Sequence, residues 1–372
     1  MPSRIRERAR VVVVTGATAG VGRAIVKRFA RAGDHVGLIA RDVAALDALR
    51  KELEAHGAVV AVAAADVADA EAVLEAGRSL ERRLGPVDIW VNDAMETVFS
   101  RFADITPQEF RRVTEVCYLG FVHGTMTALK SMRPRGRGCI VQIGSALAYR
   151  GIPLQSAYCG AKHAIRGFTD SVRTELISEG SRIRITMIDL PAVNTPQFDW
   201  ARVHMDRTPR PMGRPIEPEV VANAVFRAVR GTWREYWLGL PTMQLIIGNT
   251  VLPGLLDRYL AKNAIGGQQT KQIVAPERRD NLDQPVTSLH RTRGSFTVEA
   301  SSHSLMLPGE VARVGVVAAG ALLFFAAGAV WGAATGAMKV RHSGSPRSGE
   351  SGIHNPGAGL MEPRSSLRSA PE

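Results

Sequence analysis

The sequence predicts an α/β fold in which helices cover both faces of a doubly wound parallel sheet. Short apolar runs alternate along the chain with longer stretches of helical periodicity. The apolar runs lack polar alternation, which is typical of strands that are buried on both faces. A Gly-rich stretch follows the first run and opens the first helix. These observations together favour one α/β domain with C-terminal appendages.

Each element follows from a local pattern. Apolar runs predict strands at residues 11–14, 36–40, 59–65, 87–91, 139–143 and 183–188, and a last short strand at 235–238. Helical periodicity predicts helices at 20–32, 43–56, 70–84, 107–132, 156–179 and 218–229. Strands that are connected through helices run parallel. The predicted domain covers residues 11–265, after a basic leader at residues 1–10.

Three segments follow the predicted domain. Residues 266–313 are rich in Gln, Pro, Arg, Asp and Ser, which predicts an irregular linker. Residues 314–338 carry no charge and are long enough to cross a bilayer, so we expect a transmembrane helix there. Because Ala and Gly dominate this segment, a helix buried against the domain is the alternative. Residues 339–372 are expected to form a disordered polar tail.

Charge and composition limit the possible partners. The chain has 47 Lys and Arg against 35 Asp and Glu, a net charge of +12, which raises the hypothesis of nucleic-acid binding. No nucleic-acid motif accompanies the charge, so we expect no such partner. The cysteines Cys117, Cys139 and Cys159 lack metal-ligand spacing and no histidine pair forms a metal motif, so no metal is expected. Without an N-terminal signal region, the predicted domain is expected in the cytoplasm.

A Gly-rich loop marks a phosphate-binding site. Thr15-Gly16-Ala17-Thr18-Ala19-Gly20-Val21-Gly22 joins the first strand to the first helix. Glycines let the backbone approach a pyrophosphate, which the N–H groups and dipole of the helix N-terminus favour. An ordinary strand-to-helix turn is the alternative. The position after the first strand favours a Rossmann-like, dinucleotide-binding fold.

The order of several motifs resembles the short-chain dehydrogenase/reductase family, classical type. TGxxxGxG is followed by Asp66-Val67, Asn92-Asp93-Ala94, Ser145, the YxxxK motif at Tyr158 and Lys162, and then Pro191 and Thr195. The resemblance covers about residues 10–240. It implies a nicotinamide cofactor held by Gly16, Thr18, Ala19, Gly20, Val21, Gly22, Arg41, Asp66, Val67, Asn92, Ala94, Tyr158, Lys162, Pro191 and Thr195.

Arg41 points to NADP(H) rather than NAD(H). At the end of the second strand, an acidic side chain would bind the ribose 2′-hydroxyl of NAD, whereas a guanidinium pairs with the 2′-phosphate of NADP. Arg41 stands at this position and Asp42 follows it. In the alternative interpretation Asp42 turns inward and Arg41 is only solvated.

Three residues are the predicted catalytic group. Hydride transfer to a carbonyl leaves charge on oxygen, so the site needs a proton donor and a polarising group. The resemblance assigns Tyr158 as the acid/base, and Ser145 would stabilise the substrate oxygen. Lys162, one helical turn further on, would lower the pKa of Tyr158 and bind the nicotinamide ribose. A solvated surface pair on the helix is the alternative for Tyr158 and Lys162.

Two positions depart from the family pattern. Cys117 stands where many relatives have an Asn that holds a water behind the lysine. Because a thiol is a weak donor and acceptor, the proton relay must differ, for instance through Thr114 or a backbone carbonyl. Met95 also replaces a family glycine beside the cofactor. Neither change removes the predicted acid, lysine or serine.

A stretch between Pro191 and Pro218 bears on the substrate. It contains Phe198, Trp200, Met205 and Met212, which suit either a lid over a lipophilic alcohol or ketone or a surface loop with its own small core. The sequence thus predicts an NADP(H)-dependent, membrane-associated oxidoreductase with a small, lipid-like substrate. A catalytically weak nucleotide-sensing or scaffold protein is the alternative. Homo-oligomerisation is also expected, with Gly328, Gly332 and Gly336 as one contact.

Overall fold

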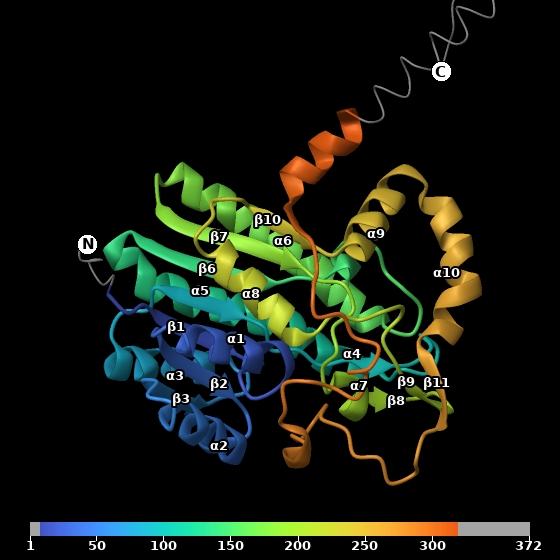
Figure 1. Ribbon diagram of the computed structural model, residues 1–372, viewed down its shortest axis with the longest axis horizontal. Coiled ribbons are helices and arrows are strands. Elements are labelled where there is room, and N and C mark those ends of the chain that lie inside the picture. Colours follow the sequence, from blue (N-terminus) through green and yellow to red (C-terminus); the bar gives the residue numbers. More distant parts are fainter. Residues whose placement is uncertain (1–7, 319–372) are drawn as a thin grey trace, which may run out of the picture. The chain divides into compact units, whose positions relative to one another are not determined.

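The computed structural model describes residues 8–318, and an eight-stranded sheet lies at their centre (Figure 1). Its strands are β1 (Val11–Thr15), β2 (His35–Ala40), β3 (Val60–Ala64), β4 (Ile89–Asn92), β6 (Arg137–Ile143), β7 (Arg182–Asp189), β10 (Glu235–Leu238) and β12 (Met306–Pro308). They lie in the order β12-β10-β7-β6-β4-β1-β2-β3. Only the β10–β12 pair is antiparallel in this sheet. The prediction of a parallel α/β sheet is confirmed.

Helices cover both faces of the sheet. α1 (Gly20–Ala30), α2 (Val43–Glu54) and α8 (Pro218–Ala228) pack on one face, and α3 (Ala70–Leu84), α5 (Gly120–Met132) and α6 (Ser156–Ser178) on the other. Successive residues of a strand point to opposite faces. Accordingly Val12 and Val14 belong to the core beneath α1, and Val11 and Val13 to the core beneath α3. Both cores exclude solvent, which explains the uninterrupted apolar runs.

Side-chain caps fix where several helices begin. Asp42 accepts a hydrogen bond from the N–H of Ala45 at the start of α2, and Asp69 caps α3 in the same way. Thr106 and Glu109 form a reciprocal capping box at α4 (Pro107–Thr114). The role of Asp42 as a cap holds its carboxylate at the helix end. Arg41, the preceding residue, is therefore left to project at the end of β2.

One predicted helix is not regular. Residues 107–132 form α4, a π-helical turn at Glu115–Leu119 and then α5. A π turn adds one residue to the helical ladder and often occurs at functional sites. Here it contains Cys117, which is fully buried. Periodicity alone located the helical stretch but not this distortion.

The region beyond β10 is more structured than the sequence indicated. α9 (Leu240–Val251) and α10 (Pro253–Gly267) were not predicted, and the expected boundary at residue 265 lies inside α10. β11 (Gln269–Ile273) then pairs with β9 (Arg207–Pro209), and smaller elements are α7 (Gln197–Trp200), β5 (Val98–Phe99) and β8 (Arg202–Val203). Residues 268–308 return along the domain to β12 (Figure 1).

The predicted membrane segment, residues 314–338, falls outside the described residues from 319 onward. Its first part continues a helix that begins at residue 309. Within residues 8–318, no helix combines the length and apolar character that a bilayer crossing requires. The chain divides into two compact units, the first of which ends at Val316. The predicted tail at residues 339–372 lies outside the described residues.

Candidate functional site

A cavity of about 740 Å³ lies at the carboxyl ends of the parallel strands. Its walls come from the loops that follow β1, β2, β3, β4, β6 and β7, together with parts of α6, α9 and α10. Ligands of doubly wound sheets bind at this edge, where the loops diverge. The topology therefore places the candidate site where the motifs predicted it.

Most of the residues predicted from the sequence meet in this cavity. Its lining includes Gly16, Thr18, Ala19, Gly20, Val21, Arg41, Asp66, Val67, Ala94, Ser145, Tyr158, Lys162, Pro191 and Thr195. These residues lie on the loops that follow six strands and on the helices α1 and α6, so only the folded chain brings them together. Two predicted cofactor residues, Gly22 and Asn92, are not part of the lining.

Asn92 points into the core instead of the cavity. Its side chain is fully buried, donates to Gln142 Oε1 at 2.9 Å and accepts from the indole N–H of Trp90 at 2.8 Å. These bonds satisfy the amide within the sheet and α5. The predicted cofactor contact of the Asn92 side chain is therefore corrected to a structural role.

Gly22 lies in the first turn of α1 and packs closely against Gly16 of the Gly-rich loop. A Cβ atom at this position would lie 2.3 Å from the carbonyl oxygen of Gly16, and Gly16 itself has a φ of +73°. The N–H of Gly22 also donates to the carboxylate of Asp93. Glycine is thus required because α1 packs directly against the loop that it follows.

Ser145 and Tyr158 form the polar centre of the cavity. Ser145 follows β6, its hydroxyl accepts from the N–H of Leu147 at 3.1 Å, and it is hydrogen-bonded to the phenol of Tyr158 on α6. Burial raises the pKa of Tyr158 above its usual range, and nearby Cys117 and Cys159 act in the same direction. The hydrogen bond from Ser145 opposes this rise. In this arrangement Tyr158 keeps its proton.

Lys162 lies beneath Tyr158 on the same face of α6. Its side chain is 2% exposed, its Nζ donates to the carbonyl oxygen of Ile143 at 2.8 Å, and it lies 5.4 Å from the centre of the Tyr158 ring. Burial lowers the pKa of Lys162, while Cys117, Asp93 and Asp189 raise it. A solvated surface pair is excluded by this burial.

Cys117 does not replace the family Asn as a relay. Its thiol donates to the carbonyl oxygen of Glu96 at 3.0 Å and accepts from the N–H of Glu96 at 3.2 Å. Thr114 donates to Phe110 in its own helix. Of the two relay partners that the sequence suggested, the backbone carbonyl is the one in contact with Lys162, at Ile143.

Asp93 is a partly buried acid of the cavity lining that the sequence analysis left without a role. Burial raises its pKa to about 7, against the influence of Lys162 and of the bond from Gly22. The carboxyl group therefore accepts a hydrogen bond from Gly22 of the Gly-rich loop and lies within electrostatic reach of Lys162. Its position inside the Asn92-Asp93-Ala94 motif was the available indication.

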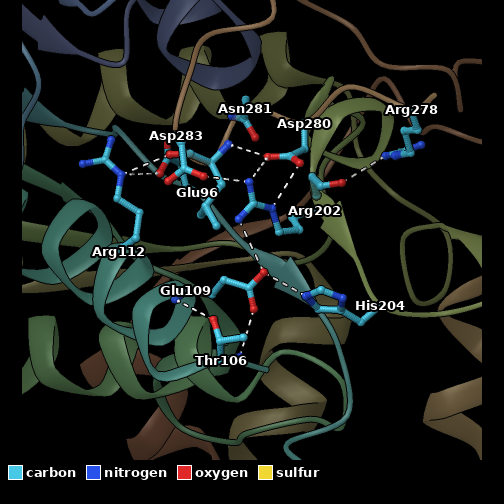
Figure 2. Close-up of polar contacts among 12 residues, drawn as sticks. Glu96, Thr106, Glu109, Arg112, Arg202, His204, Arg278, Asp280, Asn281 and Asp283 are labelled. Atoms are coloured by element: carbon cyan, nitrogen blue, oxygen red, sulfur yellow. Dashed lines mark hydrogen bonds and ion pairs between the residues drawn. The ribbon is translucent and has the colours of Figure 1, made fainter. Parts of the chain in front are cut away.

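Arg41 is partly buried and already paired within the chain. Its guanidinium lies 2.5 Å from the carboxylate of Glu96 and donates to the carbonyl oxygen of Asn281 at 2.6 Å. Arg112 approaches the same carboxylate at 3.4 Å and pairs with Asp66 at 2.7 Å. Figure 2 shows Arg112 and Glu96 beside the segment that contains Asn281. Nothing in the local sequence around Glu96, Arg112 or Asn281 indicated this cluster.

The other half of the cavity is largely apolar. Phe198, Trp200 and Met212 line it, as in the first of the two alternatives, whereas Met205 packs in a separate small core with Phe99 and Phe198, as in the second. The unpredicted helices α9 and α10 add Leu245, Leu256, Tyr259 and Leu260. This apolar part of the cavity is therefore built from segments that precede β10 in the sequence and from segments that follow it.

Comparison with known proteins agrees with this geometry. The model of the short chain dehydrogenase family matches residues 10–204. The uncharacterized oxidoreductase YxnA of Bacillus subtilis is 30% identical over 285 residues, which cover 76% of this chain and 80% of the relative.

Two solved structures are similar as well. A short-chain dehydrogenase from Streptomyces avermitilis has a TM-score of 0.59 at 25% identity, covering 70% of this chain and 99% of that one. A variant of actinorhodin polyketide ketoreductase, solved with NADPH, has a TM-score of 0.53 at 27% identity and covers 59% and 90%. From its fold, its cavity and these matches, the chain belongs to the short-chain dehydrogenase/reductase family of oxidoreductases.

Proposed function

We propose that this oxidoreductase is NADP(H)-dependent and interconverts a carbonyl and an alcohol on a lipophilic substrate. The observation that carries the proposal is a single cavity lined by Ser145, Tyr158, Lys162 and the Gly-rich loop. A nicotinamide bound at the loop supplies or accepts a hydride. The side chains then have to manage one proton and the charge on one oxygen.

Each catalytic side chain has one task in this scheme. The Tyr158 phenol gives its proton to the substrate oxygen, and the Ser145 hydroxyl donates to the same oxygen. Lys162 holds a positive charge near both and would contact the nicotinamide ribose of a bound cofactor. Because burial raises the pKa of Tyr158, the resting enzyme carries the proton that carbonyl reduction consumes.

Arg41 supports the choice of NADP(H). Arg41 and Asp42 both line the cavity at the end of β2, but the carboxylate of Asp42, the acidic alternative, caps α2 and lies 3.0 Å from Nε2 of His290. The NADPH bound to the similar ketoreductase agrees with this choice. The apolar lining from α7, α9 and α10 supports a lipophilic substrate, since large apolar side chains bind such groups by excluding water.

Turnover of a carbonyl and alcohol panel, with NADPH and NADH compared, tests this function. The panel should include water-soluble ketones and lipid-like ketones of increasing chain length. We expect kcat/KM to be higher with NADPH and to rise with chain length. Cofactor binding without turnover on any substrate would instead identify a nucleotide-sensing or scaffold protein.

Membrane attachment through residues 314–338, a cytoplasmic catalytic domain and self-association are also proposed. Exposed apolar side chains at the α9–α10 junction, Val251, Leu252 and Leu255, are compatible with a nearby bilayer. Full-length protein should remain with membranes after alkaline extraction, and a charged substitution such as Gly332→Lys should release it. Protection of the catalytic domain from protease in oriented vesicles would contradict the cytoplasmic placement.

A further inference from the structure

Residues 278–296, called the strap below, cross the adenosine end of the cavity. Asn281, Pro285, Val286 and His290 of the strap line the same cavity as the Gly-rich loop and Arg41. The strap thus forms a wall that no cofactor motif of the sequence supplies. Two sets of contacts hold it there, one on each side of the cavity.

The first set holds residues 280–283. Arg202 donates to both carboxylate oxygens of Asp280 at 3.1 Å and to Asp283 at 2.7 Å, as Figure 2 shows. The N–H of Asn281 donates to the carbonyl oxygen of Trp200 at 3.0 Å. Leu282, which is 1% exposed, packs into the apolar cluster with Cys117. This end of the strap is therefore anchored by charge and by burial.

The second set holds residues 290–296. The N–H of Gly20, at the start of α1, donates to the carbonyl oxygen of Arg291 at 3.0 Å, and Arg23 donates to that of His290 at 3.2 Å. The N–H of Gly294 donates to the carbonyl oxygen of Asn194. The strap therefore extends from the end of β2, at Arg41, to the Gly-rich loop.

Arg41 lies where the strap meets the predicted 2′-phosphate position. Its guanidinium donates to three consecutive main-chain oxygens, those of Asn281 at 2.6 Å, Leu282 at 3.4 Å and Asp283 at 3.4 Å. It also contacts Glu96. A phosphate needs the paired N–H groups of the guanidinium that these oxygens occupy. The 2′-phosphate and the main-chain oxygens of the strap therefore cannot both accept hydrogen bonds from these N–H groups of Arg41.

We propose that the strap sets the cofactor preference, because its main-chain oxygens and the 2′-phosphate of NADP(H) compete for Arg41. NADP(H) binds with residues 281–283 released from Arg41, whereas NAD(H) binds beneath the closed strap. The inference rests on the proposed pairing of Arg41 with that phosphate. Arg112, which donates to Leu282 at 3.1 Å and lies 3.4 Å from Glu96, keeps a cation beside both groups when Arg41 turns away.

Arg202 is the specificity-determining position in this scheme, acting through the strap. It is not part of the cavity lining. Arg202→Gln removes the ion pairs with Asp280 and Asp283 of the strap, and also a pair with Glu109 at 3.4 Å, so the strap should release Arg41 more readily. Arg133→Gln, which removes an exposed ion pair with Glu179 away from the strap, is the matched control.

Binding to full-length protein tests the proposal without turnover. The probes are adenosine 2′,5′-bisphosphate and NADPH, each compared with its counterpart lacking the 2′-phosphate, 5′-AMP and NADH. We expect Arg202→Gln to tighten the first two by about three- to tenfold, the range that loss of its ion pairs to the strap allows, and to change the others less than about twofold. Equal changes for both classes would overturn the proposal.

Limited trypsin digestion gives a second readout on the unmodified protein. NADPH should accelerate cleavage after Arg278 and Arg279 relative to NADH, and slower cleavage with NADPH would overturn the proposal. The Arg41→Ala variant distinguishes the proposed pairing of Arg41 with the 2′-phosphate from the proposed role of the strap. If it leaves the affinity for adenosine 2′,5′-bisphosphate unchanged, the NADP(H) assignment itself fails. If it weakens this affinity while Arg202→Gln has no selective effect, only the role of the strap fails.

Discussion

The ammonium of Lys162 donates a hydrogen bond of 2.8 Å to the carbonyl oxygen of Ile143. This bond joins α6 to the last residue of β6, two residues before Ser145. It fixes the lysine relative to both proposed catalytic hydroxyls, although these come from different elements. The arrangement places one buried cation beneath a buried phenol, and its consequences can be measured.

Replacing Lys162 should change both rate and pH dependence. We expect Lys162→Met to lower kcat/KM by about 100-fold or more, within the range of general acid–base effects. Alcohol oxidation should also begin at higher pH, because a nearby cation favours the phenolate of Tyr158. Steady-state pH profiles in both directions measure this. The exposed Lys130→Met serves as control, and an unshifted profile would remove the electrostatic role of Lys162.

Removing the phenol hydroxyl should stop chemistry without preventing binding. Tyr158→Phe is expected to lower turnover by about 10²- to 10⁴-fold while the cofactor Kd changes by less than about twofold. Tyr118→Phe, on the neighbouring π turn, should keep normal turnover. Cofactor titration followed by single-turnover kinetics separates the two effects. Near-normal turnover of the Tyr158 variant would refute its assignment as the acid.

Asp93 should make the protein less stable as pH rises. Since burial raises its pKa to about 7, the folded state retains between about pH 4 and 7 a proton that the unfolded chain has released. The free energy of unfolding therefore falls with increasing pH across this window. Asp93→Asn keeps an oxygen for the N–H of Gly22 and carries no charge. We expect it to increase stability at pH 8 by on the order of 1–3 kcal/mol and to leave stability at pH 4 nearly unchanged.

Urea unfolding at pH 4, 6 and 8 measures this effect. The exposed Asp104→Asn is the control, because its carboxyl is already solvated in the folded state. If Asp93→Asn shows the same decline between pH 4 and 8 as the unmodified protein, another group causes the decline.

A methyl group at Gly22 should disturb the loop that holds the cofactor. The added Cβ of Gly22→Ala meets the backbone oxygen of Gly16 at 2.3 Å, and a backbone atom cannot move aside as a side chain does. We expect a loss of about 1–3 kcal/mol in stability, as for other overpacked sites, together with weaker cofactor binding. Thermal unfolding with and without NADPH tests this.

Gly167 provides the matched control. It is exposed on α6, and a Cβ added there would meet no atom within 4 Å. Gly167→Ala should therefore be neutral or stabilising by about 0.5–1 kcal/mol. If both substitutions have the same effect, close packing at Gly22 is not the reason for its glycine.

The parallel sheet was predictable because its causes are local. Six of the observed strands coincide with the apolar runs of the sequence, and the helix at residues 70–84 has the predicted bounds. α9 and α10 were missed because apolar residues occur on more than one face and Pro253 interrupts the stretch. The π turn was missed because one inserted residue scarcely changes a helical pattern.

The sequence by itself determined the α/β fold and the Gly-rich loop, since each depends on neighbouring residues, and its resemblance to the short-chain dehydrogenase/reductase family indicated the Ser145, Tyr158 and Lys162 group. Only the tertiary structure decided that Asn92 points into the core and that Arg41 meets Glu96 and Asn281. The Arg41–Asn281 contact joins residues 240 positions apart. Periodicity reports which face of an element is buried, but it carries no information about which distant backbone oxygen will face a given guanidinium.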